Sequence, residues 1–393
     1  MKIGQTIYFD HQATTPLDFN VYEAMQPYTA ESFGNPHSSE HIIGWRARKA
    51  VDKAASDVAE LIGADADEMI FTSGATEANN LALLGLARGV EKCKRKRILL
   101  SEIEHKCVLE IGRVLQKELN YEVRRIPVDD TGSLKLKILE EEMDEDVLLV
   151  SIMAVNNEIG TIQDIPAISR ITSRYGSVLH CDAAQAPCAL DITSLAQYAD
   201  LVSLSGHKMY GPMGVGALYA RRSLHNSIQP IIYGGGQQNG LRPGTLPTPL
   251  CVGLGAAAKQ MIGELASAER KAVSIRRDLF ARLVAELPFE TWVNGPAEGT
   301  LRHPGNINIG FSGVSAADLL NRLQPRLAAS SGSACSSGIT EPSHVLRAIG
   351  LGEKDASSSV RFSIGRHTSD DDIYEAVEVL QASLEDIREN GLL

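Results

Sequence analysis

Short runs that are apolar on both faces alternate with longer amphipathic patterns through the first two thirds of the chain, and this alternation restricts the fold more than any other feature. The apolar runs are 68–73, 97–100, 146–155, 177–181 and 200–204. Strands of a parallel sheet covered by helices have this pattern, because neither face meets water. Between them, residues 40–62 place a stripe of apolar side chains at helical spacing: Ile43, Ala47, Ala50, Ala54, Val58 and Leu61. The sequence therefore predicts an α/β fold with a mainly parallel sheet.

The pattern changes near residue 262, and a second, smaller α+β domain is expected after it. Residues 263–287 predict a long helix with this apolar stripe: Leu265, Ala268, Ala272, Ile275, Leu279 and Leu283. Ile307, Ile309 and Phe311 alternate with polar residues, as in a strand with one solvated face. Ser369 and the three acids after it predict the start of a last helix, whose buried face includes Ile373, Ala376 and Leu380. We expect a large domain over 16–262 and a small domain formed by 1–15 and 263–393.

The charge balance and the cysteine content argue against several classes of protein. Thirty-eight Lys and Arg against 49 Asp and Glu give a net charge of −11, which disfavours direct binding to nucleic acid or to an anionic membrane. The basic run 92–97 is interpreted as a solvated helix end. No uncharged apolar stretch approaches the roughly 18 residues that span a bilayer, so a cytoplasmic protein is expected. Six scattered cysteines with no C-x-x-C pair predict neither a disulfide scaffold nor a metal site.

Two segments at predicted strand ends carry residues suited to an anion and to a ring nitrogen. In 72–77 (TSGATE) small residues lie where a strand gives way to a helix, so backbone N–H groups there would approach an anion. The alternative is a plain turn. Asp182 follows the run 177–181, with Gln185 three residues later. A carboxylate there would keep the ring nitrogen of pyridoxal phosphate (PLP) protonated, so that the ring accepts electrons. The alternative is a helix N-cap.

Lys208 closes a third segment, 203–208 (SLSGHK), directly after a buried run. A buried lysine is costly unless it is paired or used chemically, and a Schiff base with PLP would use it. Ser205 and His207 beside it would hold the cofactor phosphate. A hydrolase triad of Ser205, His207 and Asp182 is the competing interpretation. The chain has no G-x-S-x-G elbow, however, and a triad would leave Lys208 unexplained.

The order of these three segments resembles the fold-type I PLP enzymes of the class V aminotransferase family, and more narrowly the cysteine desulfurases. The resemblance runs from near residue 6 to near residue 388. The stretches that carry it are 8–16 (YFDHQATTP), 33–38 (FGNPHS), 104–106 (EHK), 155–160 (VNNEIG), 205–208 (SGHK), 242–245 (RPGT) and 330–335 (SSGSAC). The chain departs from the family at Met213, where a basic residue is common, and at His11-Gln12. Neither position carries the chemistry.

The resemblance implies a role for each matching residue around the cofactor ring. Lys208 would be the Schiff-base lysine. Asp182 would pair with the ring nitrogen, and Gln185 with the phenolic oxygen. His105 would stack on the ring face and act as an acid and base.

Further roles concern the phosphate and the substrate. Four residues would hold the cofactor phosphate: Ala75, Thr76, Ser205 and His207. Thr245 would reach the site of a second subunit, which implies a homodimer. Asn157, which also lies beside the cofactor, and Arg361 would bind the substrate carboxylate, because a guanidinium fits a carboxylate with two hydrogen bonds.

Cys335 lies in a small, polar, glycine-bearing stretch, 327–338, which predicts a mobile loop. An exposed thiol there ionises and reacts, unlike one in an apolar strand, and the resemblance implies that Cys335 is the nucleophile. The other five cysteines are interpreted as core packing: Cys93, Cys107, Cys181, Cys188 and Cys251.

The activity that the resemblance implies converts L-cysteine to L-alanine and leaves the sulfur on Cys335 as a persulfide for an acceptor protein. Iron–sulfur cluster assembly, tRNA thiolation and DNA sulfur modification are the pathways left open for that acceptor. Two alternatives share the cofactor residues. One is a selenocysteine lyase or another class V aminotransferase, and the other is an inactive sulfur-relay partner.

Overall fold

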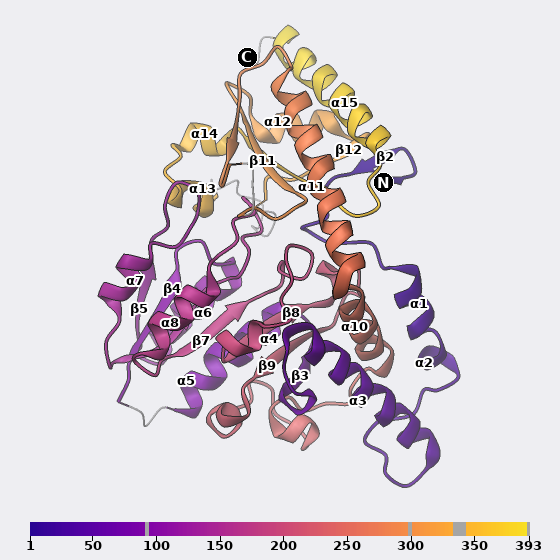
Figure 1. The fold of residues 1–393 in the computed structure, drawn as a ribbon, viewed down its shortest axis with the longest axis vertical. Coiled ribbons are helices and arrows are strands. Elements are labelled where there is room, and N and C mark those ends of the chain that lie inside the picture. The colour runs from indigo at the N-terminus through magenta and orange to yellow at the C-terminus, as the bar shows by residue number, and fades with distance from the viewer. Residues whose placement is uncertain (91–93, 298–300, 333–342, 391–393) are drawn as a thin grey trace.

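The structure is a computed structural model that describes residues 1–90, 94–297, 301–332 and 343–390. Figure 1 shows two groups of elements. The larger sheet and most of the helices occupy the lower part of the view, and the N-terminal strands lie in the upper part with the elements that follow α11 (Gly263–Ala285). The predicted α/β class with a second α+β group is confirmed.

A seven-stranded sheet forms the centre of the larger group, and all its described strand pairs are parallel except the two made by β9. In spatial order the strands are β3 (Met69–Thr72), β9 (Gly216–Ala220), β8 (Leu201–Ser205), β7 (Val178–Asp182), β6 (Val147–Ser151), β4 (Arg97–Ser101) and β5 (Glu122–Ile126). Every residue of β3, β6, β8 and β9 is buried. The five apolar runs of the sequence therefore correspond to β3, β4, β6, β7 and β8.

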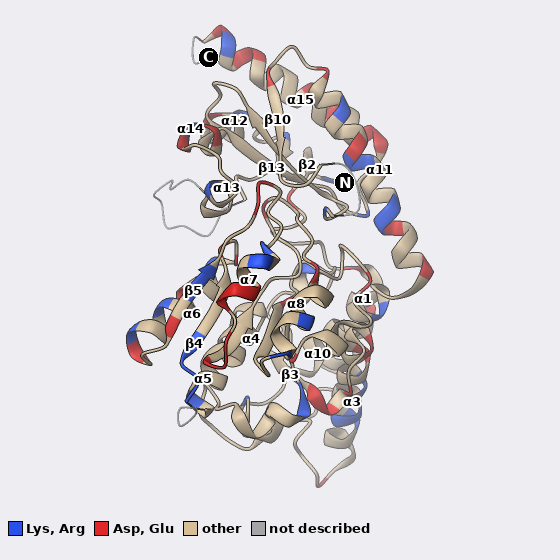
Figure 2. Cartoon of the chain, turned by 60° about the vertical axis from the view of Figure 1, so that its left-hand side comes forward, with Lys and Arg blue, Asp and Glu red and all other residues tan. Residues whose placement is uncertain are grey.

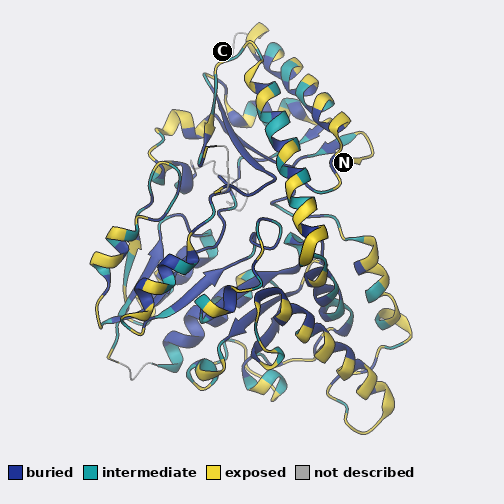
Figure 3. Ribbon diagram, in the orientation of Figure 1, coloured by how far each residue is buried: buried dark blue, intermediate teal, exposed yellow. Residues whose placement is uncertain are grey.

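Helices cover both faces of this sheet, and Figure 3 shows the strands as a buried layer between partly exposed helices. The helices of the larger group are α1 (Phe19–Met25), α2 (Pro27–Ala30), α3 (Ile42–Ile62), α4 (Ala75–Asn80), α5 (Leu86–Gly89), α6 (Lys106–Glu118), α7 (Leu136–Glu142), α8 (Ile165–Ser173), α9 (Leu195–Tyr198) and α10 (Thr248–Gln260). Local chemistry explains the bounds of α3, since the His41 side chain accepts a hydrogen bond from the Gly44 N–H and Gly63 ends the helix in a left-handed conformation at φ 73°.

Two three-stranded sheets belong to the smaller group. Their strands are β1 (Lys2–Ile3), β2 (Thr6–Tyr8) and β12 (Leu327–Ala328), and β10 (Thr291–Asn294), β11 (Asn306–Phe311) and β13 (Ser359–Ser363). The helices with them are α11, α12 (Ala316–Leu323), α13 (His344–Ala348), α14 (Glu353–Ser357) and α15 (Asp370–Glu389). Ile7 and Phe9 pack in one apolar cluster with Phe280 and Phe362. That cluster agrees with a small domain of 1–15 and 263–393, but the exact division stays a prediction.

Charged residues of both signs are interspersed on the helices, as Figure 2 shows along α11 and α15. The described part of the basic run 92–97 is tied to the protein itself, because Arg97 forms ion pairs with Glu122 and Asp144, and Arg95 donates to the carbonyl oxygens of Val147 and Tyr175. Within the described ranges, none of the helices has the length and apolar character to cross a membrane.

A buried histidine links three strands of the large sheet and leads to a prediction about acid stability. His180 on β7 lies 2.8 Å from Ser151 Oγ and 3.1 Å from Ser203 Oγ, and burial lowers its pKa to about 4. Between pH 6.5 and 4 the unfolded chain therefore binds a proton there that the folded chain excludes, so stability falls as the pH falls. We expect His180→Asn to flatten the dependence of the unfolding free energy on pH by up to about 1.4 kcal/mol per pH unit in this window.

Urea denaturation at pH 7.0, 6.0 and 5.0 measures that slope. The exposed His37→Asn is the matched control and should keep the parental slope. An unchanged slope in His180→Asn would contradict the prediction.

Candidate active site

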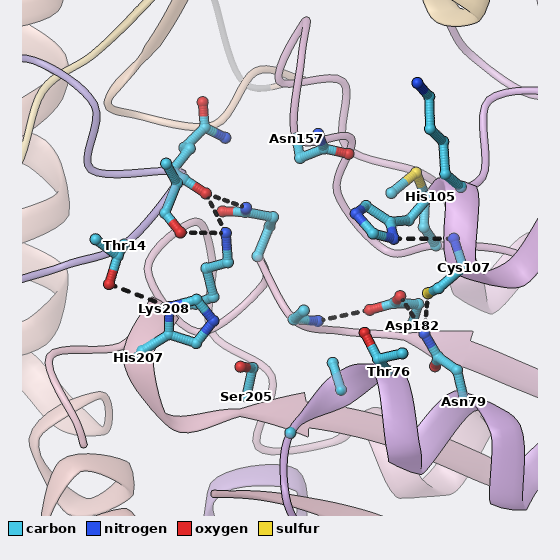
Figure 4. A pocket seen from close by; sticks show the side chains of 18 of the residues that line it. Thr14, Thr76, Asn79, His105, Cys107, Asn157, Asp182, Ser205, His207 and Lys208 are labelled. Carbon is cyan, nitrogen blue, oxygen red and sulfur yellow. Dashed lines mark hydrogen bonds between the residues drawn. The ribbon is translucent and has the colours of Figure 1, made fainter. Parts of the chain in front are cut away.

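A cavity of about 580 Å³ lies at the carboxyl ends of β7 and β8, where α/β sheets bind their ligands. Residues from both groups of elements form its wall, since Gly332 and Arg361 line it together with residues of the large sheet. Ten residues that the sequence predicted for the site line this one cavity: Ala75, Thr76, His105, Asn157, Asp182, Gln185, Ser205, His207, Lys208 and Arg361. Figure 4 shows Lys208, Asp182 and His105 around it.

Lys208 ends a short 3-10 turn that directly follows β8. Its ammonium group donates hydrogen bonds to the main-chain carbonyl oxygens of Gln12 and, at 2.7 Å, of Ala13. The Gln12 oxygen also accepts a hydrogen bond from the side chain of Gln185 at 2.9 Å. The N-terminal segment therefore fixes the position of Lys208 at the cavity wall and ties it to Gln185.

Asp182 is the last residue of β7 and is buried. Asn79 Nδ2 donates to its Oδ2 at 2.8 Å, and the Ala184 backbone N–H donates to its Oδ1 at 3.0 Å; Figure 4 draws both bonds. Both oxygens of the Asp182 carboxylate therefore accept a hydrogen bond from a fixed donor. The site thus presents a fixed negative charge to a cationic group in the cavity.

His105 caps the N-terminus of α6, because its Nδ1 accepts a hydrogen bond from the Cys107 N–H at 3.2 Å. In the neutral ring the proton is then on Nε2. Burial lowers the pKa of His105, the nearby charge of Asp182 acts against that shift, and the charge of Lys208 adds to it. At neutral pH the ring is therefore uncharged and has one N–H to donate.

The turn between β3 and α4 closes another side of the cavity. A Cβ atom at Gly216 would lie 2.7 Å from the Cα of Gly74, so glycine at 216 is what allows β9 to approach this turn. The helix that begins at Ala75 continues through 81–85 into α5, and its first N–H groups favour an anion.

His207 and Ser205 are also part of the cavity wall. His207 Nδ1 lies 3.1 Å from Thr14 Oγ1, and burial together with the charge of Lys208 lowers the pKa of His207 to about 4. A neutral imidazole and two hydroxyl groups leave this side of the cavity rich in hydrogen-bonding groups without adding a second cation.

Arg361 lies in the middle of β13 and is 3% exposed. Its Nη1 donates to the Asn157 carbonyl oxygen at 2.8 Å, and its Nη2 forms an ion pair with Asp10. The same Nη2 donates to Ser330 Oγ at 2.8 Å. Asn157 and Arg361, which were predicted to bind one carboxylate, are therefore adjacent.

Cys107 shows where the sequence interpretation was incomplete. It was taken as core packing, but it lines the cavity, and its Sγ accepts a hydrogen bond from Asn79 at 3.3 Å. Burial raises the pKa of Cys107 to about 12, so the thiol is protonated and is a poor nucleophile. Its position two residues after His105, at the start of a helix, was the available signal.

Two predicted residues are not among those that the structure places in the cavity wall, for different reasons. Thr245 is exposed and lies outside the cavity wall as the structure describes it. Cys335 lies outside the described residues, as does Cys93. The roles assigned to Thr245 and Cys335 therefore stay predictions.

The donor set fits a PLP molecule. Three polar atoms of residues lining the cavity are buried and have no hydrogen-bond partner among the described residues: Gln12 Nε2, Asn79 Oδ1 and Arg361 Nε. PLP requires an amine for its aldehyde, an ionised carboxylate for its pyridine nitrogen and a helix N-terminus for its phosphate, and the cavity wall offers all three. In contrast, the described residues contain no group of three or more His, Cys, Asp or Glu side chains placed to hold a metal ion.

Comparison with known proteins places the chain in a family. The family model described as aminotransferase class-V matches residues 7–375, and the chain belongs to this family. The class V resemblance expected from the motifs is confirmed.

Similar proteins cover nearly the whole chain. A "Cysteine desulfurase IscS" of Rickettsia massiliae is 43% identical over 99% of this chain and 93% of its own, and one of Rickettsia rickettsii is 44% identical over 97% and 92%. Among solved structures, a "NifS-like protein" has 33% identity and a TM-score of 0.89 over 97% of this chain and 99% of its own. "SspA in complex with cysteine" has 35% identity and a TM-score of 0.79 over 92% and 99%.

Proposed function

We propose that this protein is a PLP-dependent cysteine desulfurase, which converts L-cysteine to L-alanine and retains the sulfur as a persulfide on Cys335. The observation that carries the proposal is the meeting of Lys208, Asp182 and Arg361 at one cavity. These groups suit a cofactor aldehyde, a ring nitrogen and an amino-acid carboxylate respectively. The names of the curated relatives support the same reaction.

Each of the site residues has its own role in this reaction. Bound PLP supplies an electron sink for negative charge at the substrate α-carbon. Lys208 Nζ anchors the cofactor and then takes the α-proton, while Asp182 keeps the ring nitrogen protonated. His105 would lie against the cofactor ring and exchange protons through Nε2, and Arg361 with Asn157 would bind the substrate carboxylate.

Sulfur transfer requires a thiolate. In the proposed step the Cys335 thiolate attacks the substrate sulfur and forms an S–S bond, and the carbon–sulfur bond breaks with its electron pair left on carbon. The carbon takes up a proton and becomes the methyl group of alanine. The persulfide on Cys335 is then passed to an acceptor protein. That protein would act in iron–sulfur cluster assembly, tRNA thiolation or DNA sulfur modification.

Exposed apolar side chains on the surface of the chain support a homodimer. Several large apolar side chains are exposed on the segments before and within α1 and α3: Leu17, Phe19, Tyr22, Phe33, Ile42, Ile43 and Trp45. An apolar surface of this kind is typical of a protein–protein contact. We propose that a second copy of this chain covers it and that Thr245, exposed in its own subunit, completes the partner's phosphate site.

Product analysis tests the proposed function. Incubation of the PLP-loaded enzyme with L-cysteine and dithiothreitol should give alanine and sulfide in equal amounts, whereas omission of the reductant should stop the reaction after about one sulfur per active site. An aminotransferase would yield a keto acid without sulfide, and a relay partner would yield neither. A selenocysteine lyase would release alanine from selenocysteine but not from cysteine.

Asp182→Asn should lower the turnover of L-cysteine by roughly two to four orders of magnitude, because a neutral amide cannot hold the ring nitrogen in its protonated form. The cofactor should remain bound through Lys208, so its absorbance persists while alanine formation is lost. Asp200→Asn is the control, since Asp200 is paired with Arg221 at the start of β8, away from the cavity. Near-normal turnover in Asp182→Asn would contradict this role.

A further inference from the structure

Both terminal nitrogens of Arg361 form hydrogen bonds with the protein itself. Nη1 donates to the Asn157 carbonyl oxygen at 2.8 Å. Nη2 contacts Asp10 Oδ1 at 2.5 Å and Ser330 Oγ at 2.8 Å. Nε alone is buried without a hydrogen-bond partner in the part of the chain that the structure describes.

The backbones that carry these partners are fixed by strand pairing. Ser330 and Arg361 form an antiparallel bridge, in which the Ser330 N–H donates to the Arg361 oxygen at 3.2 Å and the Arg361 N–H donates to the Ser330 oxygen at 2.7 Å. Asp10 is bridged to Ser363 on the same strand as Arg361. Ser330 Oγ also donates a hydrogen bond to Asp10 Oδ1 at 3.0 Å. Rotation about one bond moves the Ser330 hydroxyl off Nη2 without moving the backbone.

An arriving carboxylate has to displace one of these partners. A carboxylate binds a guanidinium best through two parallel hydrogen bonds from neighbouring nitrogens. Nε and Nη2 lie on one edge of the guanidinium, and Nε is the buried donor without a partner. Of the two groups on Nη2, Asp10 is a charged acceptor, whereas Ser330 accepts the hydrogen bond from Nη2 on a neutral hydroxyl oxygen. Ser330 is therefore displaced more readily.

We propose that Ser330 is a positioning residue that occupies Arg361 Nη2 in the substrate-free enzyme and yields it to the substrate carboxylate. The affinity for the substrate is then set by this competition. Ser330 Oγ also accepts a hydrogen bond from the Gly332 N–H at 3.3 Å, so the exchange links carboxylate binding to the backbone at Gly332, which lines the cavity. The inference rests on the proposed function only in taking Arg361 as the carboxylate ligand.

Equilibrium binding to the PLP-loaded enzyme tests the competition. L-alanine and ethylamine are titrated while the cofactor absorbance is followed, because ethylamine is L-alanine without its carboxylate. In Ser330→Ala the dissociation constant of L-alanine should fall about three- to tenfold, since one competing hydrogen bond to a charged group is removed. The constant for ethylamine should stay the same.

Two further variants separate positioning from a general structural effect. Ser330→Thr keeps a hydroxyl group and should restore the parental constant for L-alanine to within about twofold. Ser359→Ala removes a different buried hydroxyl, which lies on β13 and contacts Asn294 and the Asp355 carbonyl oxygen, and it should change neither titration.

An unchanged or weaker affinity for L-alanine in Ser330→Ala would overturn the proposal, as would parallel changes for L-alanine and ethylamine. Because the readout is binding, it does not depend on sulfur release. An enzyme that binds L-alanine as expected but forms no sulfide would therefore refute the desulfurase proposal and leave the competition at Arg361 supported.

Discussion

Replacing Lys208 with alanine is expected to lower alanine and sulfide production from L-cysteine by more than about a thousandfold, because one side chain supplies both the covalent anchor and the base for the α-proton. Another side chain of the site would not easily replace Lys208, because the main-chain carbonyl oxygens of Gln12 and Ala13 hold the Lys208 ammonium group in place. Borohydride treatment followed by peptide mapping should find cofactor fixed to Lys208 in the parent protein and to no residue in Lys208→Ala.

Lys106 is the matched control for this experiment, because it is a second lysine that lines the same cavity. Lys106→Ala should retain both the borohydride-fixed cofactor and the activity. If Lys208→Ala still gave a fixed cofactor, another lysine, with Lys106 first among them, would be the anchor, and the assignment of Lys208 would be wrong.

The parts of the fold that were predictable from sequence are those in which burial acts on both faces of an element. Strands β6 and β8 are completely buried, so their apolar runs could be recognised without knowledge of their neighbours. In α15 the predicted face is also correct, since Ile373, Ala376 and Leu380 are buried behind a capping box formed by Ser369 and Asp372. Local chemistry and burial point to the same answer in these elements.

Other elements were predicted less well. On α11 the predicted stripe is correct only in part. Leu279 and Leu283 pack against the core, but Leu265 and Ile275 are exposed, while Val273 and Phe280 are buried. Ile43 of α3 is likewise exposed. Strand β11 was expected to have one solvated face, but all its residues are buried. Several apolar stripes fit one helix, and only its tertiary contacts select among them.

Some residues of the candidate site were also predictable from the sequence, and others were not. Residues at strand ends, such as Asp182 and Lys208, were predictable because parallel strands bring their carboxyl ends to one edge. Asn79 was missed, since an amide inside a short helix with other polar residues carries no signal until the neighbouring strand end is known. Asp10 and Ser330 are 320 residues apart in sequence and contact each other directly, and no local pattern indicates such a pair.

Cys335→Ser is expected to bind cofactor and L-cysteine but to form no persulfide, with alanine production lowered by more than about a thousandfold. The described thiols support this choice of nucleophile. Burial raises the pKa of Cys107, of Cys188 and of Cys251 to about 12, and that of Cys181 well above its ordinary value. A thiol that stays protonated near pH 8 is a poor nucleophile.

Cys107→Ser is the control for Cys335→Ser, because Cys107 is the thiol that the structure places in the cavity wall. Alkylation after a single exposure to L-cysteine, followed by mass spectrometry, should find the extra sulfur on the peptide with Cys335 in the parent protein and in Cys107→Ser. Extra sulfur on Cys107, or normal sulfide release by Cys335→Ser, would show that the sulfur is received within the cavity itself. Retention of the cofactor spectrum in both variants would show that the loss concerns sulfur transfer, because the groups that hold the cofactor are untouched.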